Sequence, residues 1–345
     1  MRRAFIPGLV VFLFAPFCIA QTTKKVVITS LGPFYSRIGE KELAEFRTAA
    51  PNINLVVAED KSKMMAEVAD ADGIIGAINP EIFRAAKKLK WVQVQQAGVE
   101  NTLFPELKNS QVVLTNCKIT QGPEIGDHAF AMLLSLTREL YRIIPRRAKE
   151  EWLRSEYHPI ELKDKVAVIV GMGGIGTNIA QRAKGFGMKV IGLDPREMVA
   201  PTVLLDQWHP PDRLDEVLPE ADVLFIAAPS TAESAKMVGA REFGLMKRTS
   251  YFICVSRGRL YDMNALVKAL EAKQIAGAGV DVTDPVEPLP AGHPLWKFEN
   301  VIVTPHIAGR SDGEHARYMA LFKENLRRFG KGETLIYVVD KQKGY

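Results

Sequence analysis

Residues 166–176 read VAVIVGMGGIG, and this stretch decides the fold of the chain. An all-apolar run ends in the pattern G-x-G-x-x-G, and a segment of helical period follows it. In this context the first glycine permits a tight turn, the second lets backbone approach a pyrophosphate, and the third lets the helix pack closely on the strand. The helix N-terminus faces the anion. The stretch therefore predicts a dinucleotide site built from Gly171, Gly173, Gly174, Ile175 and Gly176.

A carboxylate closes the apolar run that follows this helix. Asp194 stands where an acidic side chain accepts hydrogen bonds from the hydroxyl groups of an adenosine ribose. A 2′-phosphate would be repelled by Asp194, so the sequence predicts NAD in preference to NADP. Arg196 stands nearby and is able to pair with a phosphate, which keeps NADP open as the alternative.

Short β-branched runs alternate with helical segments on both sides of the glycine loop, a pattern typical of parallel sheets covered by helices. The predicted strands of a first series lie at 26–30, 53–58, 73–77, 91–95 and 112–115, and those of a second at 166–170, 190–193, 223–227, 251–255, 278–282 and 301–304. A long apolar helix over 125–143 connects the two series, and its apolar stripe fits either core packing or a dimer seam. A helix over about 313–329 and a short strand over 335–339 end the sequence.

These elements predict an α/β protein with two Rossmann-like or flavodoxin-like parallel-sheet domains separated by a cleft. Residues 24–120 and 311–345 form the first domain, which we expect to bind substrate, and residues 121–310 form the NAD-binding domain. Because such sheets bind ligands at the carboxyl ends of their strands, the chemistry should face the cleft.

Composition excludes several classes of protein. The 345 residues are 47% hydrophobic and 25% charged, which excludes a disordered or polytopic membrane protein and allows two cores. The net charge of +5 is not gathered in a long basic cluster, so no nucleic-acid partner is expected. Cysteines 18, 117 and 254 have neither zinc-site spacing nor the density of a disulfide framework, so we expect no metal and no bridge.

The first twenty residues resemble a targeting segment. Arg2 and Arg3 precede the apolar run 9–15, and Ala20 precedes a polar stretch, which predicts a secretory signal peptide over 1–20. The apolar run is too short for a bilayer core of about 30 Å, so no stable membrane insertion is expected after cleavage. The arginine pair fits both an ordinary signal and the twin-arginine signal. We expect export to the periplasm or secretion, and an unprocessed chain would stay in the cytoplasm.

Three polar residues follow consecutive strands of the second series: Arg257, Glu287 and His306. With these residues the sequence resembles the D-isomer-specific 2-hydroxyacid dehydrogenase family, in particular glyoxylate/hydroxypyruvate reductases and phosphoglycerate dehydrogenases. The likeness covers nearly all of residues 26–330. The matching stretches are 171–176, 229–231, 255–258, 279–282, 293–296 and 304–309.

The resemblance implies an NAD-dependent enzyme that interconverts small 2-oxo acids and D-2-hydroxy acids. His306 would be the general acid–base, Glu287 would orient its imidazole, and Arg257 would hold the substrate carboxylate. The backbone N–H groups of Ala97, Gly98 and Val99 would bind the same carboxylate. Asp281 would contact the nicotinamide carboxamide, and Pro229 would belong to the cofactor site. The resemblance also implies a homodimer.

One departure from the family bears on mechanism. The stretch between Asp281 and Glu287 is one residue longer than the usual pattern, which predicts a displaced Glu287 carboxylate, with Asp284 as the fallback partner of His306. The alternative to an enzyme is an NAD(H)-sensing or ligand-binding interaction protein of the same fold with little turnover.

Overall fold

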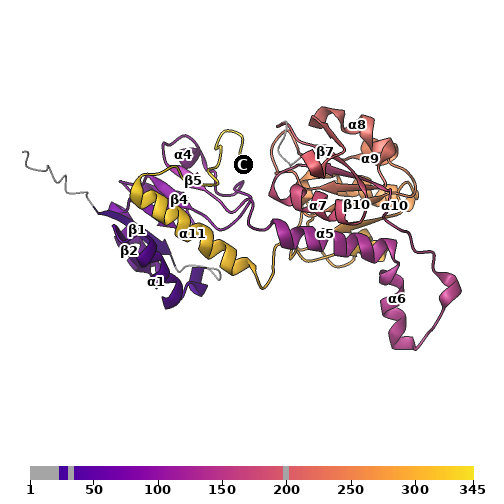
Figure 1. Cartoon of the computed structure of the whole chain (residues 1–345), viewed down its shortest axis with the longest axis horizontal. Helices are drawn as coiled ribbons and strands as arrows, with labels where there is room; N and C mark the ends of the chain where they lie inside the picture. Colours follow the sequence, from indigo (N-terminus) through magenta and orange to yellow (C-terminus); the bar gives the residue numbers. More distant parts are fainter. Residues whose placement is uncertain (1–22, 30–34, 197–201) are drawn as a thin grey trace, which may run out of the picture.

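A computed structural model describes residues 23–29, 35–196 and 202–345, and the predicted signal peptide lies outside this part of the chain. Two α/β domains lie side by side, each built on its own parallel sheet (Figure 1). The predicted fold class is therefore confirmed. Among the described residues, no helix has both the length and the apolar character needed to cross a bilayer.

The first sheet is formed by residues near the N-terminus. Its strand order is β2-β1-β3-β4-β5, all parallel. Apolar runs explain the buried centre: Val26 of β1 is fully buried and pairs with Leu55 on one side and Gly73 on the other. The strands are β1 (Lys24–Thr29), β2 (Ile53–Ala58), β3 (Gly73–Ile75), β4 (Trp91–Gln93) and β5 (Val113–Thr115), and the helices between them are α1 (Glu40–Ala49), α2 (Lys61–Glu67), α3 (Pro80–Ala85) and α4 (Pro105–Lys108).

The last helix returns to this first sheet. α11 (Glu314–Lys331) packs against α1, and its Phe322 and Phe329 are buried in one cluster with Val26, Phe46 and Trp91. The rings of Trp91 and Phe329 lie 4.9 Å apart. Residues from opposite ends of the sequence therefore share this core, and Figure 1 shows α11 lying along the first domain.

The strand predicted over 335–339 is absent, and this expectation was wrong. The segment makes one isolated antiparallel bridge, between Val338 and Thr115. The side chain of Asn325 accepts a hydrogen bond from the Ile336 amide at 2.9 Å and donates one to its carbonyl at 3.0 Å. Because a buried side chain satisfies these backbone groups, they do not need a strand partner.

The second sheet has seven parallel strands in the order β12-β11-β10-β9-β6-β7-β8. Six of them were predicted, and the seventh, β8 (Gln207–His209), is a short edge strand. Its sequence has no apolar run, which explains why periodicity missed it. The others are β6 (Val166–Val170), β7 (Lys189–Leu193), β9 (Val223–Ile226), β10 (Tyr251–Cys254), β11 (Gly277–Val280) and β12 (Val301–Val303).

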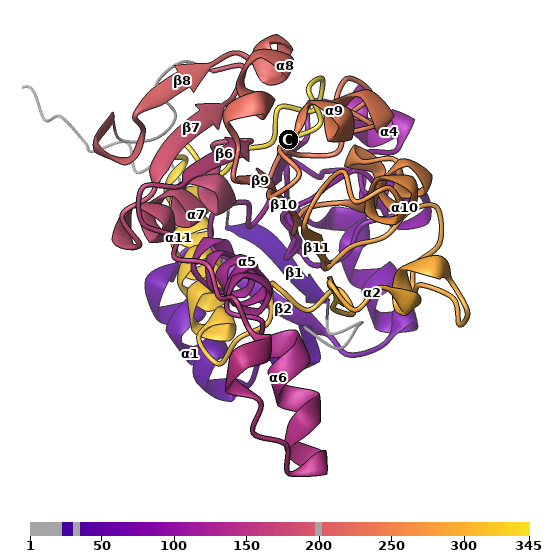
Figure 2. The same ribbon diagram turned by 90° about the vertical axis from the view of Figure 1, so that its right-hand side faces the viewer.

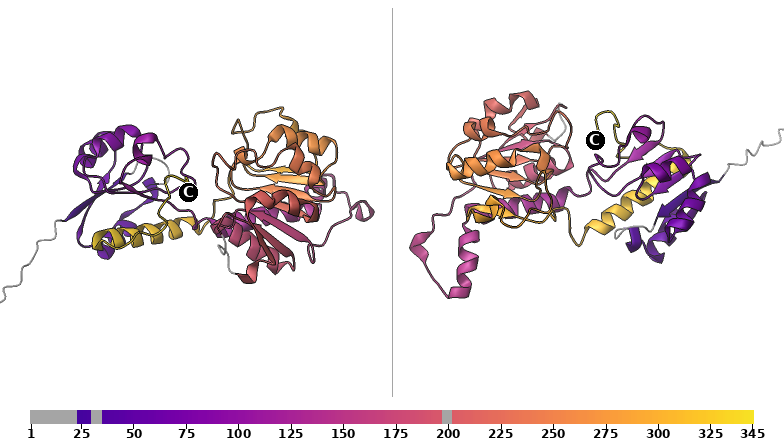
Figure 3. Two further views of the ribbon diagram at one scale, coloured as in Figure 1. Left: turned by 90° about the horizontal axis from the view of Figure 1, so that it is seen from above. Right: turned by 180° about the vertical axis from the view of Figure 1, so that it is seen from behind.

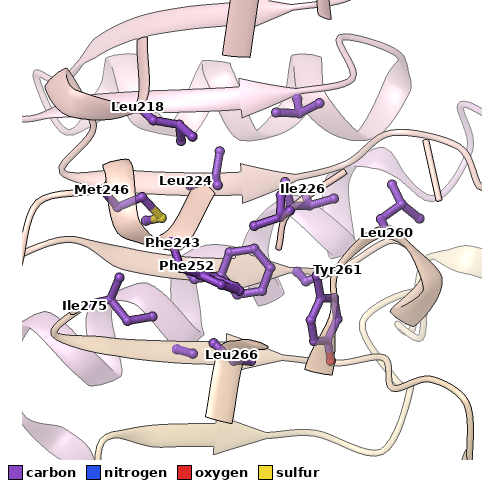
Figure 4. Close-up of a cluster of buried hydrophobic side chains, with 14 of the residues drawn as sticks. Leu218, Leu224, Ile226, Phe243, Met246, Phe252, Leu260, Tyr261, Leu266 and Ile275 are labelled. Carbon is purple, nitrogen blue, oxygen red and sulfur yellow. The ribbon is translucent and has the colours of Figure 1, made fainter. Parts of the chain in front are cut away.

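One face of this sheet is covered by α8 (Leu214–Val217), α9 (Ala240–Leu245) and α10 (Met263–Glu271). Phe243, Phe252 and Tyr261 lie close together in the core on this face (Figure 4). Phe252 of β10 packs edge-on against Phe243 and Tyr261, with ring centroids 5.2 and 5.3 Å away. The Tyr261 hydroxyl donates to the Val282 carbonyl at 2.8 Å. This bond anchors the start of the loop that carries Glu287.

The single helix predicted over 125–143 is two helices, α5 (Gly122–Thr137) and α6 (Leu140–Arg146). Glu139 breaks the helix because it adopts a left-handed conformation with φ of 54°. Its carboxylate accepts a hydrogen bond from Arg142 at 2.5 Å and from the His158 amide at 2.9 Å. Apolar periodicity does not show such a break. α5 packs on α7 (Gly174–Gly185), whereas α6 projects away from the second domain (Figure 2).

Two chain segments run between the domains, one before α5 and one before α11 (Figure 3). Arg317 of α11 contacts both: its Nε donates to the Thr120 carbonyl at 2.8 Å, and its Nη2 donates to Ser311 at 3.2 Å. The same Nη2 donates to the buried carboxylate of Glu124 on α5 at 2.6 Å. One side chain thus joins both segments at the junction.

Candidate active site

A cavity of about 880 Å³ lies between the two domains, at the carboxyl ends of the second sheet's strands. Residues from both domains line it. Twelve of the residues singled out from sequence take part: Ala97, Gly98, Gly171, Gly173, Gly174, Ile175, Asp194, Arg196, Pro229, Arg257, Asp281 and His306. Gly176, Val99 and Glu287 do not line the cavity but stand directly behind residues that do.

The His306 imidazole contacts Glu287. Nδ1 of His306 lies 2.7 Å from Oε1 of Glu287, and both side chains are less than half exposed. The displacement expected from the longer loop is therefore wrong, and Asp284 does not take the place of Glu287. Thr283 explains this, because its hydroxyl donates to the Val286 carbonyl at 2.8 Å and folds the extra residue into a turn. Asp284 instead lines a separate small pocket.

The backbone around His306 is held by Asp281, a buried residue at the end of β11. His306 has a positive φ of 52°, and its amide donates to the Asp281 carbonyl at 3.0 Å. The Asp281 carboxylate accepts from the amides of Ile307 and Ala308, both at 3.0 Å, and from the Thr304 hydroxyl at 2.6 Å. Asp281 therefore fixes the loop that presents His306 to the cavity.

A second histidine extends this network. Nε2 of His128, on α5, lies 2.9 Å from the Thr304 hydroxyl oxygen. Because Thr304 donates its proton to Asp281, the hydroxyl oxygen accepts from His128, so Nε2 of His128 carries a proton. His128 thus ties α5 to the loop of His306.

Arg257 faces the first domain across the cavity. Its Nε donates to Oε1 of Glu100 at 2.5 Å, and its Nη1 donates to the Ser256 carbonyl at 2.8 Å. Glu100 follows the loop of Ala97 and Gly98, and sequence reasoning missed it. The adjacent predicted carboxylate-binding loop was the available signal.

The amides of Ala97 and Gly98, two residues that line the cavity, are available to a ligand. Within the described part of the chain, the N–H groups of Ala97, Gly98 and Val99 donate to no other protein group. Asn116 fixes the loop by donating to the Ala97 carbonyl at 2.6 Å, and the Val99 side chain is buried in the core. The loop therefore presents free backbone donors on a fixed support, beside Arg257.

The glycine loop fits a dinucleotide. A Cβ on Gly176 would lie 1.9 Å from the Gly171 carbonyl oxygen, so only glycine permits this approach of α7 to β6. Gly171 has a φ of 90°, which favours glycine. At Gly173, by contrast, a Cβ would meet no atom within 4 Å, so the cavity is open where a pyrophosphate would approach the first turn of α7.

Asp194 and Arg196 line the end of the cavity next to β7. The buried Asp194 carboxylate accepts from the Met172 amide at 2.9 Å and from Nε of Arg196 at 3.1 Å. The hydrogen bond from this guanidinium to Asp194 raises the pKa of Arg196. Arg196 also lies over the Tyr345 ring, 5.7 Å from its centroid, so a residue of the C-terminal segment lines this end too.

Two cysteines lie in the core near this arrangement, and the thiol of Cys254 lies 3.7 Å from the Arg257 carbonyl oxygen. Cys117 and Cys254 are both buried free thiols, and desolvation raises the pKa of Cys254 to about 12. Within the part of the chain that the structure describes, no group of three or more His, Cys, Asp or Glu side chains is arranged to hold a metal ion.

A dinucleotide loop that shares one cavity with a histidine–carboxylate pair and an arginine defines a two-domain dehydrogenase. Comparison with known proteins gives the family. Residues 130–308 match the family model of the D-isomer specific 2-hydroxyacid dehydrogenase, NAD binding domain. The chain belongs to this family and is a dehydrogenase.

Individual relatives match most of the chain in sequence or structure. A glyoxylate reductase of Korarchaeum cryptofilum is 33% identical over 310 residues, which cover 87% of this chain and 90% of the relative. A D-isomer specific 2-hydroxyacid dehydrogenase family protein from Aeromonas salmonicida matches 92% of this chain and 99% of its own, with 27% identity and a TM-score of 0.77. An NADPH-dependent glyoxylate/hydroxypyruvate reductase of Sinorhizobium meliloti, solved with NADP and sulfate, matches 93% of this chain and 100% of its own, with 25% identity and a TM-score of 0.76.

Proposed function

We propose that this dehydrogenase reduces small 2-oxo acids of the glyoxylate and hydroxypyruvate type to D-2-hydroxy acids, with NADH as the preferred reductant. The observation that carries the proposal is that the Glu287–His306 pair, Arg257 and the glycine loop meet at one cavity. Relatives named glyoxylate reductase support this class of substrate.

In this proposal His306 donates a proton from its imidazole to the carbonyl oxygen of the substrate, and takes it back in the reverse direction. Glu287 accepts from Nδ1–H and so directs Nε2 into the cavity. Arg257 and the amides of the Ala97–Gly98 loop bind the substrate carboxylate. The bound nicotinamide supplies the hydride.

We propose NAD as the main cofactor because the Asp194 carboxylate stands at the end of β7, where ribose hydroxyls would reach it. Arg196 supports some use of NADP, since it could leave Asp194 for a 2′-phosphate.

The test is the oxidation of NADH and of NADPH, followed at 340 nm, with glyoxylate, hydroxypyruvate, pyruvate, phenylpyruvate, 2-oxoglutarate and a phosphorylated 2-oxo acid. We expect turnover with glyoxylate or hydroxypyruvate. His306→Gln should abolish turnover and retain NADH binding by fluorescence. Retained turnover in this variant would refute the assignment of His306, and NADH binding without turnover by the unmodified protein would favour the sensing alternative.

We propose in addition that the protein is a homodimer held by the arm around α6, by which we mean residues 140–156. Ile144 and Trp152 of this arm are 64% and 94% exposed, an unusual state for large apolar side chains. Covering them with a second copy removes that surface from water.

We further propose that residues 1–20 direct export, which the arginine pair and the apolar run support. Twin-arginine transport of folded protein would let bound dinucleotide cross with the enzyme. Replacing Arg2 and Arg3 by lysine should then leave precursor in the cytoplasm, whereas continued export would favour the general secretory route.

A further inference from the structure

The ion pair between Glu100 and Arg257 joins the two domains inside the cavity. Glu100 belongs to the loop after β4 of the first domain, and Arg257 follows β10 of the second. Their side chains are 31% and 33% exposed, so both are partly shielded from water. Both residues line the cavity, and each charge therefore faces the space that substrate has to enter.

The guanidinium of Arg257 has few free N–H donors on the side where Glu100 lies. A carboxylate that binds an arginine side-on needs Nε–H and one Nη2–H together. Here Nε is already bound to Glu100 at 2.5 Å, and Nη1 is bound to the Ser256 carbonyl. Nη2 lies against the loop itself, since a Cβ on Gly98 would come within 2.2 Å of it. A second carboxylate cannot bind side-on while Glu100 holds Nε.

We propose that Glu100 is an internal, displaceable carboxylate that occupies the substrate-carboxylate position on Arg257, so that its exchange for substrate sets substrate affinity. The proposal rests on the proposed function, because it takes Arg257 as the ligand of the substrate. Glu100 is the same chemical group as the part of the substrate that it replaces. It neutralises Arg257 before substrate enters, and each binding event has to break one charge-assisted hydrogen bond before making another.

If Glu100 had a supporting role instead, its removal would change KM in the opposite direction. If Glu100 only oriented Arg257 for substrate, its removal would loosen the guanidinium and weaken binding. If Glu100 competes with substrate, its removal strengthens binding. Both roles predict a change in KM, so the direction of that change distinguishes them.

The test compares Glu100→Gln with Glu100→Asp in the full chain. With glyoxylate and saturating NADH, we expect Glu100→Gln to lower KM about three- to tenfold, the range for a charge-assisted bond between partly exposed groups. Glu100→Asp keeps a competing charge and should stay nearer the unmodified KM. Glu81→Gln, which removes a surface carboxylate paired with Lys61 on the same domain, is the matched control and should leave KM unchanged.

A second measurement needs neither cofactor nor turnover. Phenylglyoxal labelling, mapped by mass spectrometry, reports how available the Arg257 guanidinium is, and the exposed Arg310 of the same cavity serves as the internal reference. Relative to Arg310, labelling of Arg257 should rise at least about threefold in Glu100→Gln. Unchanged labelling, or an unchanged or higher KM, overturns the proposal. Absence of turnover in the unmodified protein would count against the proposed function alone, and labelling would still decide the role of Glu100.

Discussion

Glu287 lies 2.7 Å from Nδ1 of His306 although the loop that carries it is one residue longer than the family pattern. The turn closed by Thr283 and Val286 takes up the added length. Glu287→Gln should therefore lower kcat/KM about ten- to a hundredfold, because an amide does not stabilise the imidazolium as a carboxylate does. Asp284→Asn is the control and should change kcat/KM less than about twofold. Comparable losses in both variants would mean that the loop closes differently in the working enzyme.

Cofactor preference depends on the Asp194–Arg196 pair. Arg196→Ala should raise KM for NADPH about tenfold or more, since it removes the cation that could meet a 2′-phosphate, and should affect NADH much less. Asp194→Ala should reduce the preference for NADH. Steady-state kinetics with both cofactors measures the ratio, and equal effects of Arg196→Ala on NADH and NADPH would contradict this account.

The arm around α6 offers a test of assembly. Ile144→Asp places a charge on an exposed apolar position and should shift the protein from dimer to monomer, as measured by sedimentation velocity. Lys149→Asp, on the same arm but without an apolar side chain, is the comparison variant. A monomeric unmodified protein would end the proposal.

Both buried thiols should be inert in the folded protein. Because burial raises the pKa of Cys254 to about 12, its thiol stays protonated at pH 8, and the thiolate is the reactive form. Iodoacetamide at pH 8 should label neither Cys117 nor Cys254 until urea is added, and reactivity should grow as the pH rises toward 12. Peptide mapping distinguishes the two sites. Rapid labelling of the native protein would show that the β10 end opens.

The core shared by α11 and the first sheet predicts a specific loss of stability. Phe322 is fully buried between them, so Phe322→Ala should reduce the free energy of unfolding of the first domain by about 3–5 kcal/mol. Urea denaturation followed by tryptophan fluorescence should report this through Trp91. NADH affinity should change less, since the glycine loop belongs to the other sheet, and an equal loss of both would mean that the two domains unfold as one unit.

The sequence predicts the sheets well because most of their strands are short apolar runs rich in β-branched residues. It predicts the strand-end positions of Arg257 and His306 for the same reason, as parallel strands present their carboxyl ends at one edge. Two predictions of secondary structure were wrong, the strand over 335–339 and the single helix over 125–143. Both segments depend on side-chain contacts between residues that are distant in the sequence. Asn325 replaces a strand partner for Ile336, and Glu139, whose carboxylate accepts from the distant His158 amide, interrupts a helix with its left-handed backbone. The apolar periodicity of a sequence predicts neither of these hydrogen bonds, and it does not predict the contact between Glu100 and Arg257.

The return of α11 to the first sheet has a consequence for biosynthesis. A ribosome delivers β1 to β5 well before Phe322 and Phe329, so Val26 and Trp91 lack their cover until the whole second domain has been translated. The second domain is continuous in sequence from α5 to β12, so all of its elements are available before α11 is translated. It is therefore free to fold first. During that interval the nascent first sheet exposes an apolar face, the kind of surface that favours aggregation and that chaperones bind.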